Sequence, residues 1–162
     1  MAHQIVEPNP HDAVVPAGAA SVGKLIELDE AMQVIVLYMR RWTTSIDQRD
    51  CVWKDATDRF GQAKAHRVIG ALDIFLQTVA NHAKRPIQRH GRGCNCLGED
   101  EAVLAEIVSG AGRRAGPLLR VLCHSLIVPA GFTETILAAV QLYEILSEPS
   151  TKPFVTSGST LH

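Results

Sequence analysis

Residues 82–101 read HAKRPIQRHGRGCNCLGEDE, a Gly- and Arg-rich break between two segments whose apolar residues recur at helical spacing. Two histidines and two cysteines fall inside this stretch: His82, His90, Cys94 and Cys96. Clustered cysteines and histidines in a chain without a secreted disulfide framework indicate metal or redox chemistry. The stretch therefore predicts a chemically active loop that joins two helices.

The four side chains match the donors that proteins use for zinc. A structural zinc site takes four ligands, usually thiolates and neutral imidazoles, in a tetrahedron. The spacing H-x7-H-x3-C-x-C allows Cys94 and Cys96 to chelate one ion from a tight turn, with His90 reaching it from the same loop. His82 can add a ligand from the end of the preceding helix. We therefore predict a zinc site made by His82, His90, Cys94 and Cys96.

The surroundings of the cysteines favour thiolates and an ordered loop. Four cations, Lys84, Arg85, Arg89 and Arg92, lie nearby with no acid between residues 83 and 98, and a helix N-terminus follows Cys96. Both effects lower the pKa of a thiol. The loop has little apolar material with which to offset its ordering entropy. Zinc binding contributes on the order of 10 kcal/mol at neutral pH, which is enough to order it.

Other interpretations of the same residues remain open. The cysteines could belong to an inert loop, or could form a Cys94–Cys96 disulfide that senses redox state. Cys123 and His124 lie together on a predicted helix, and either could replace His82 as the fourth ligand. The acids Glu99–Glu101 are interpreted as charges that cap the next helix rather than as catalytic groups.

The segments around the loop predict an all-α fold. Before it, helical spacing indicates helices at about 22–45, 47–60 and 63–84, the last with an inward stripe of Val68, Leu72, Phe75, Val79 and His82. After it, helices are expected from residue 99 to Gly110, at 117–127, and from Thr133 as N-cap to 146, the last as the central helix. The residues of the helix at 117–127 that we expect to point inward are Leu118, Leu119, Leu122 and Leu126.

No strand pattern is evident in the sequence. The fold class is therefore a compact bundle of five to six helices, with the Cys/His loop between the third and fourth. We expect residues 1–20 to be a flexible arm, 21–147 the bundle domain and 148–162 a flexible tail.

Composition limits the partners and the compartment. The formal net charge of −1 provides no global basic field that would attract nucleic acid or a membrane surface. The N-terminus has no secretory pattern, and no apolar run is long enough to span a bilayer. Reduced cysteines suit the cytoplasm, which is where we expect the protein to be.

The His90–Cys96 run, H-x3-C-x-C, is similar to the H-x3-C-x2-C signature of zinc-binding anti-sigma factors, which are also small, helical and cytoplasmic. It departs from that signature by one residue between the cysteines, and the similarity covers only this run. It therefore does not assign the chain to the family.

Three functional hypotheses follow. The first is a non-enzymatic interaction or regulatory module held by zinc, which binds a protein partner or forms a homodimer through helix 22–45, since that helix has two apolar sides. The second is a nucleic-acid-binding regulator that uses the basic loop 84–92. The third is a metal-dependent hydrolase with an open zinc position. No catalytic motif is present, so an enzyme is the less favoured class.

Overall fold

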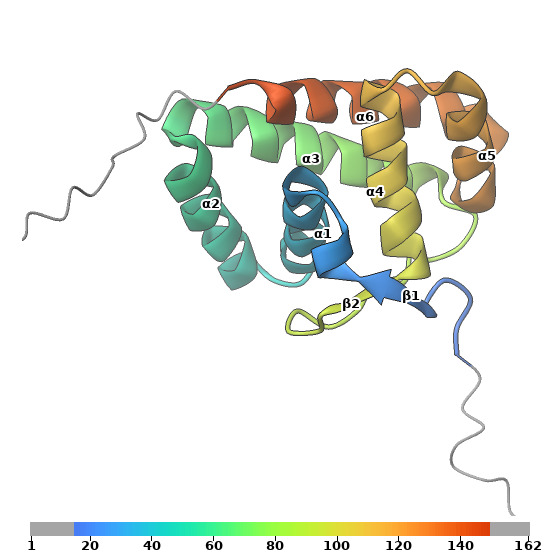
Figure 1. Cartoon of the computed structure of the whole chain (residues 1–162), viewed down its shortest axis with the longest axis horizontal. Coiled ribbons are helices and arrows are strands. Elements are labelled where there is room, and N and C mark those ends of the chain that lie inside the picture. The colour runs from blue at the N-terminus through green and yellow to red at the C-terminus, as the bar shows by residue number, and fades with distance from the viewer. Residues whose placement is uncertain (1–14, 150–162) are drawn as a thin grey trace, which may run out of the picture.

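The computed structural model describes residues 15–149, so the expectations for residues 1–14 and 150–162 lie outside the described residues. The described part of the chain is an all-α bundle, as predicted (Figure 1). Its six α-helices are α1 (Glu30–Trp42), α2 (Ile46–Phe60), α3 (Gln62–His82), α4 (Glu99–Gly112), α5 (Gly116–Leu126) and α6 (Phe132–Ser147). None of these helices is long and apolar enough to cross a membrane.

Helices α3 and α6 pack side by side, and α2, α1 and α4 extend from them (Figure 1). The predicted stripe of α3 is confirmed, because Val68, Leu72, Phe75 and Val79 are all buried. Gly61 separates α2 from α3 with a φ of 81°, a conformation that glycine adopts without a steric penalty. The local helical spacing of apolar residues therefore located this part of the fold correctly.

Helix α1 is buried over most of its circumference. Val34, Ile35 and Val36 occupy three consecutive positions and are each at most 5% exposed, and three consecutive positions cover most of a helix circumference. Helices α2, α3 and α4 of the same chain pack against it. The second apolar side that led us to expect self-association through this helix is thus covered within the chain. Helix α6, predicted to be the central helix, packs against α3, α4 and α5, although Leu137 on its outer side is 62% exposed.

A two-stranded antiparallel sheet accompanies the bundle, although the sequence shows no strand pattern. Strand β1 (Ser21–Lys24) pairs with β2 (Cys96–Gly98), so it joins the N-terminal segment to the Cys/His loop. The predicted helix 22–45 therefore began too early. It starts at Glu30, where Asp29 is the N-cap and accepts a hydrogen bond of 2.9 Å from the Met32 N–H.

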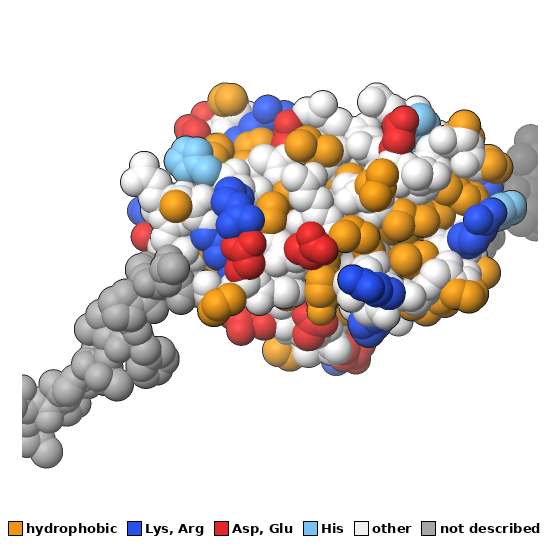
Figure 2. All heavy atoms as spheres, turned by 90° about the horizontal axis from the view of Figure 1, so that it is seen from above, with side chains coloured by type: hydrophobic (Ala, Val, Ile, Leu, Met, Phe, Trp, Pro, Cys, Tyr) orange, Lys and Arg blue, Asp and Glu red, His pale blue; other side chains and the backbone are white. Residues whose placement is uncertain are grey.

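Helices α5 and α6 leave apolar side chains in solvent. Leu118, predicted to point inward, is 47% exposed, and Val121 and Leu137 are 68% and 62% exposed. Figure 2 shows hydrophobic side chains gathered toward the α5 end of the face that it presents. Helix α6 begins at Phe132 with Gly131 as N-cap, so Thr133 does not cap it. Of the α5 residues predicted to point inward, Leu119 and Leu126 are buried and Leu118 is exposed, because the helix buries only one narrow stripe.

Candidate metal centre

The structure brings together three of the four predicted ligands. Atoms from His90, Cys94 and Cys96 that could bind a metal all lie within 4.8 Å of one another. The His90 Nδ1 atom lies 2.9 Å from Cys96 Sγ and 3.8 Å from Cys94 Sγ. The three residues are therefore close enough to bind a single metal ion.

The contact between His90 Nε2 and the Ala19 carbonyl fixes how the His90 ring faces the two sulfurs. Its Nε2 lies 3.0 Å from the carbonyl oxygen of Ala19, which can only accept a hydrogen bond. Nε2 must therefore carry the proton, and in the neutral ring Nδ1 then presents a lone pair toward the sulfurs. A backbone carbonyl on the far nitrogen is the usual support for a metal-binding histidine. In its neutral form the ring is thus oriented as a metal ligand requires.

The two cysteines are joined as a disulfide in the structure. This bond corresponds to the redox-pair interpretation of the C-x-C sequence. The backbone N–H of Cys96 lies 3.3 Å from Cys94 Sγ and donates to it, a contact that also stabilises a thiolate. Two electrons and two protons would convert the disulfide to two thiols, and only that reduced form offers two thiolates to a metal.

Arg40 of α1 holds the backbone of the loop and was missed by the sequence analysis. It is 2% exposed, and its guanidinium donates hydrogen bonds to the carbonyls of Cys94 and Cys96 at 2.7 Å each, and to that of Gly91 at 3.3 Å. Its remaining N–H groups donate to Glu101 at 2.7 Å each. All five guanidinium donors are therefore used, and three of them hold the backbone of the loop.

Glu101 completes this arrangement from the first turn of α4. Its carboxylate accepts both Arg40 hydrogen bonds and the backbone N–H groups of His90 at 3.1 Å and Gly98 at 3.0 Å. Burial disfavours its charge, but these donors outweigh burial, so the pKa of Glu101 lies below its ordinary value. Glu101 does cap the helix as predicted, through Gly98, and it also neutralises a buried arginine.

The adjacent acid neutralises part of the predicted basic loop. The buried Asp100 accepts two hydrogen bonds from Arg85, at 2.6 and 2.8 Å, and one from the backbone N–H of Gln88 at 2.8 Å. Lys84 donates to the carbonyl of His124. Within residues 15–149, only Arg89 and Arg92 of the four loop cations lack a bonded partner. Among these four cations, Arg85 is the one paired with an acid in the described residues, and Lys84, Arg89 and Arg92 keep an uncompensated positive charge.

The remaining candidate ligands lie elsewhere. The structure does not bring His82 to the other three; its Nε2 bonds to Glu134 of α6 at 2.9 Å. Cys123 is fully buried, which raises the pKa of its thiol, and the ring of His124 faces Phe132. Neither joins the group. In the described residues, the group therefore has three protein ligands.

Residues 18–20, which the sequence placed in a flexible arm, contact the site. The N–H groups of Asp100 and Glu99 donate to the carbonyls of Gly18 and Ala20, and Ala19 supplies the acceptor for His90. Gly18 has a φ of 88°. A Cβ atom at Gly18 would collide with the Asp100 carboxylate. Glycine is therefore required for this segment to approach the start of α4.

Comparison with known proteins supplies no family for the chain. It matches no protein-family model, no curated protein and no solved structure. What the protein does must therefore be inferred from the site itself.

Proposed function

We propose that the reduced protein binds one zinc ion through His90 Nδ1 and the thiolates of Cys94 and Cys96, and acts as a non-enzymatic regulatory module in the cytoplasm. The observation that carries this proposal is the His90 ring. Its Nε2 proton donates to the Ala19 carbonyl, which leaves the Nδ1 lone pair facing both sulfurs. A reducing compartment is part of the proposal because the disulfide form offers no thiolates.

The donor set favours zinc over other common metals. Magnesium and calcium prefer oxygen ligands, and the group offers one imidazole and two sulfurs. Copper(I) also takes thiolates, but imidazole–thiolate sets in tetrahedral sites are typical of zinc. The fourth position is left to water or to a donor from another molecule.

A regulatory role fits the site better than hydrolysis. Three protein ligands with an open position also occur in zinc hydrolases, which additionally need a general base beside the bound water. Glu101 is the acid bonded to this loop, and both of its oxygens are occupied by Arg40 and by backbone N–H groups. In the described residues it has no capacity left to accept a proton from water, so no base is assigned.

The metal content of the full chain tests the proposal. Protein purified under reducing conditions without added metal should contain one zinc ion per chain by elemental analysis. Cobalt(II) substitution should give a thiolate-to-cobalt absorption band, because two thiolates bind the ion. His90→Ala should greatly reduce retention, whereas His82→Ala should retain the metal, since His82 bonds to Glu134.

Two results would contradict the proposal. One is reduced, folded protein without any bound metal after exposure to zinc. The other is equal loss of metal from the His82 and His90 variants, which would show that the geometry of the three-residue group does not identify the ligands.

The segment that orients His90 gives a second prediction. Gly18→Ala should displace residues 18–20 and weaken the hydrogen bond from His90 to Ala19. Loss of such a support lowers metal affinity by roughly 10- to 100-fold. Competition with a chromophoric chelator measures the change.

Gly93→Ala is the matched control for Gly18→Ala. It adds the same methyl group inside the loop, where nothing lies within 4 Å of the new atom. Equal zinc affinities for the two variants would mean that the Ala19 carbonyl does not support the ligand.

A further inference from the structure

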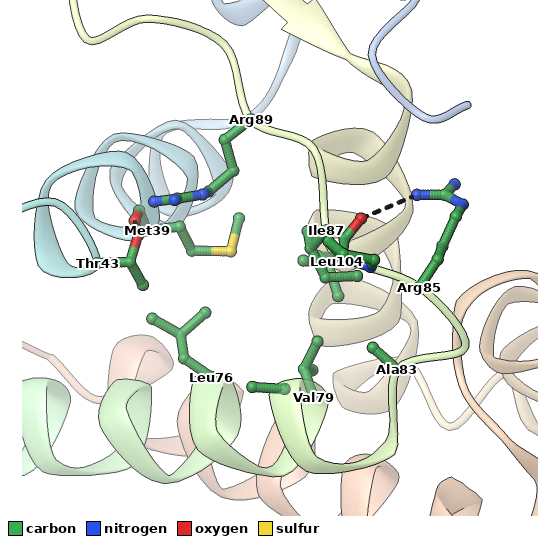
Figure 3. Close-up of a pocket in the computed structure, with 11 residues that line it drawn as sticks. Met39, Thr43, Leu76, Val79, Ala83, Arg85, Ile87, Arg89 and Leu104 are labelled. Carbon is green, nitrogen blue, oxygen red and sulfur yellow. Dashed lines mark hydrogen bonds between the residues drawn. The ribbon is translucent and has the colours of Figure 1, made fainter. Parts of the chain in front are cut away.

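The crossover that carries His90 also covers a cavity of about 410 Å³ (Figure 3). Its lining is mainly apolar: Met39 from α1, Leu76 and Val79 from α3, Ile87 from the crossover and Leu104 from α4. The volume falls within the ~300–1,000 Å³ range of small-molecule pockets. The cavity is therefore large enough for a small ligand with an apolar body.

One uncompensated cation stands at the edge of this cavity. Figure 3 shows the Arg89 side chain extending toward the α1 side of the cavity, whereas Arg85 points away. Arg85 is neutralised by Asp100. Arg89 has no hydrogen bond or ion pair within residues 15–149, and no acidic side chain lines the cavity. The rim therefore carries a single free positive charge.

We propose that this cavity binds an amphipathic monoanion, a carboxylate on an unbranched or aromatic apolar body. The apolar part would displace water from Met39, Leu76 and Ile87, and the carboxylate would pair with the Arg89 guanidinium. A cationic ligand would be repelled by Arg89. A highly polar ligand such as a nucleotide would leave buried groups without partners.

This inference goes beyond the metal site. None of the residues that line the cavity is one of the three candidate ligands. Ile87 and Arg89 belong to the same crossover as His90, so the ligand would contact the backbone that leads into the metal-binding loop.

Titration calorimetry of the full chain with decanoate tests the proposal, using concentrations at which the ligand does not aggregate. Decanoate should bind at one site more tightly than decanol, which has the same body without the charge, and decyltrimethylammonium should bind most weakly. Arg89→Ala should weaken decanoate binding by about fivefold, as expected for a partly exposed ion pair, and leave decanol binding unchanged. Arg92→Ala is the matched control, because Arg92 is a nearby exposed arginine outside the cavity lining.

A blocking variant shows whether the ligand occupies this cavity. Ala80 lines it from an exposed position on α3, so Ala80→Trp should fill the space without disturbing buried residues. Binding should be lost while the thermal unfolding transition is retained. Undiminished decanoate binding by folded Ala80→Trp, or equal affinities of wild type for decanoate and decanol, would overturn the proposal.

Discussion

Replacing Glu101 with glutamine should lower the free energy of unfolding by about 3–5 kcal/mol, the usual cost of removing one partner of a buried ion pair. Arg40 and Glu101 are 1% and 0% exposed in their side chains. Glutamine keeps the shape of the side chain, but its amide NH₂ would replace one carboxylate oxygen that accepts hydrogen bonds. Two N–H donors would then face each other at that position. The Arg40 charge would then remain buried without a counterion. Urea denaturation at neutral pH measures the loss.

Acidic pH should reduce the difference in unfolding free energy between wild type and Glu101→Gln. The pKa of Glu101 is depressed in the folded protein, so its contribution is present above the ordinary glutamate pKa of ~4.3 and is lost as the pH falls through the depressed value. Glutamine does not titrate in this range. The two unfolding free energies should therefore approach each other in strongly acidic buffer.

Glu99→Gln is the matched control for this experiment. Glu99 occupies the same helical turn but is exposed, so its replacement should change the unfolding free energy by no more than ~0.5 kcal/mol. If Glu101→Gln were as mild as Glu99→Gln, the buried pair would not be what holds the loop.

The helical bundle was predictable because its signals are local. Val68, Leu72, Phe75 and Val79 recur at helical spacing within one segment, and the structure buries them all. The strand Ser21–Lys24 carried no such signal, since its Val22 is 55% exposed and its order comes from pairing with Cys96–Gly98. Pairing between distant segments leaves no trace in the spacing of either one.

The hydrogen bonds by which Arg40 holds the candidate site could not be predicted either, because they also join distant segments. Arg40 bonds to carbonyls more than fifty residues further along the chain. One signal was present: Arg40 follows the fully buried Val36 by four residues, which places a cation on an apolar helical face. A charge at such a position requires a buried partner, and Glu101 was the acid that could supply it.

The choice of His82 shows the limit of an argument from helical phase. His82 continues the stripe of α3, so the sequence placed it on the buried side near the loop. The side chain instead bonds to Glu134, and its ring packs beside Gly131. Phase gives the direction in which a side chain leaves its helix, but the neighbouring element that receives it depends on the whole fold.

Cys94→Ser combined with Cys96→Ser should abolish zinc binding. The double variant should therefore melt at a lower temperature than the zinc-loaded wild type. Two of the three ligands are lost, and serine hydroxyls bind zinc weakly compared with thiolates. Elemental analysis of the purified variant should find no stoichiometric metal. Cys51→Ser is the control, because Cys51 is a free, exposed cysteine outside the group and its variant should retain one zinc ion.

The fold of the double variant should nevertheless survive. Small zinc domains unfold without metal because zinc supplies ~10–16 kcal/mol of their folding free energy. Here Arg40 bonds to the backbone carbonyls of Cys94 and Cys96, which serine retains. We therefore expect cooperative unfolding of the variant, at the same temperature as reduced, metal-free wild type. Complete unfolding of the double variant would show that the metal, rather than the Arg40–Glu101 pair, orders the loop. Retention of zinc by the double variant would refute the proposed metal site.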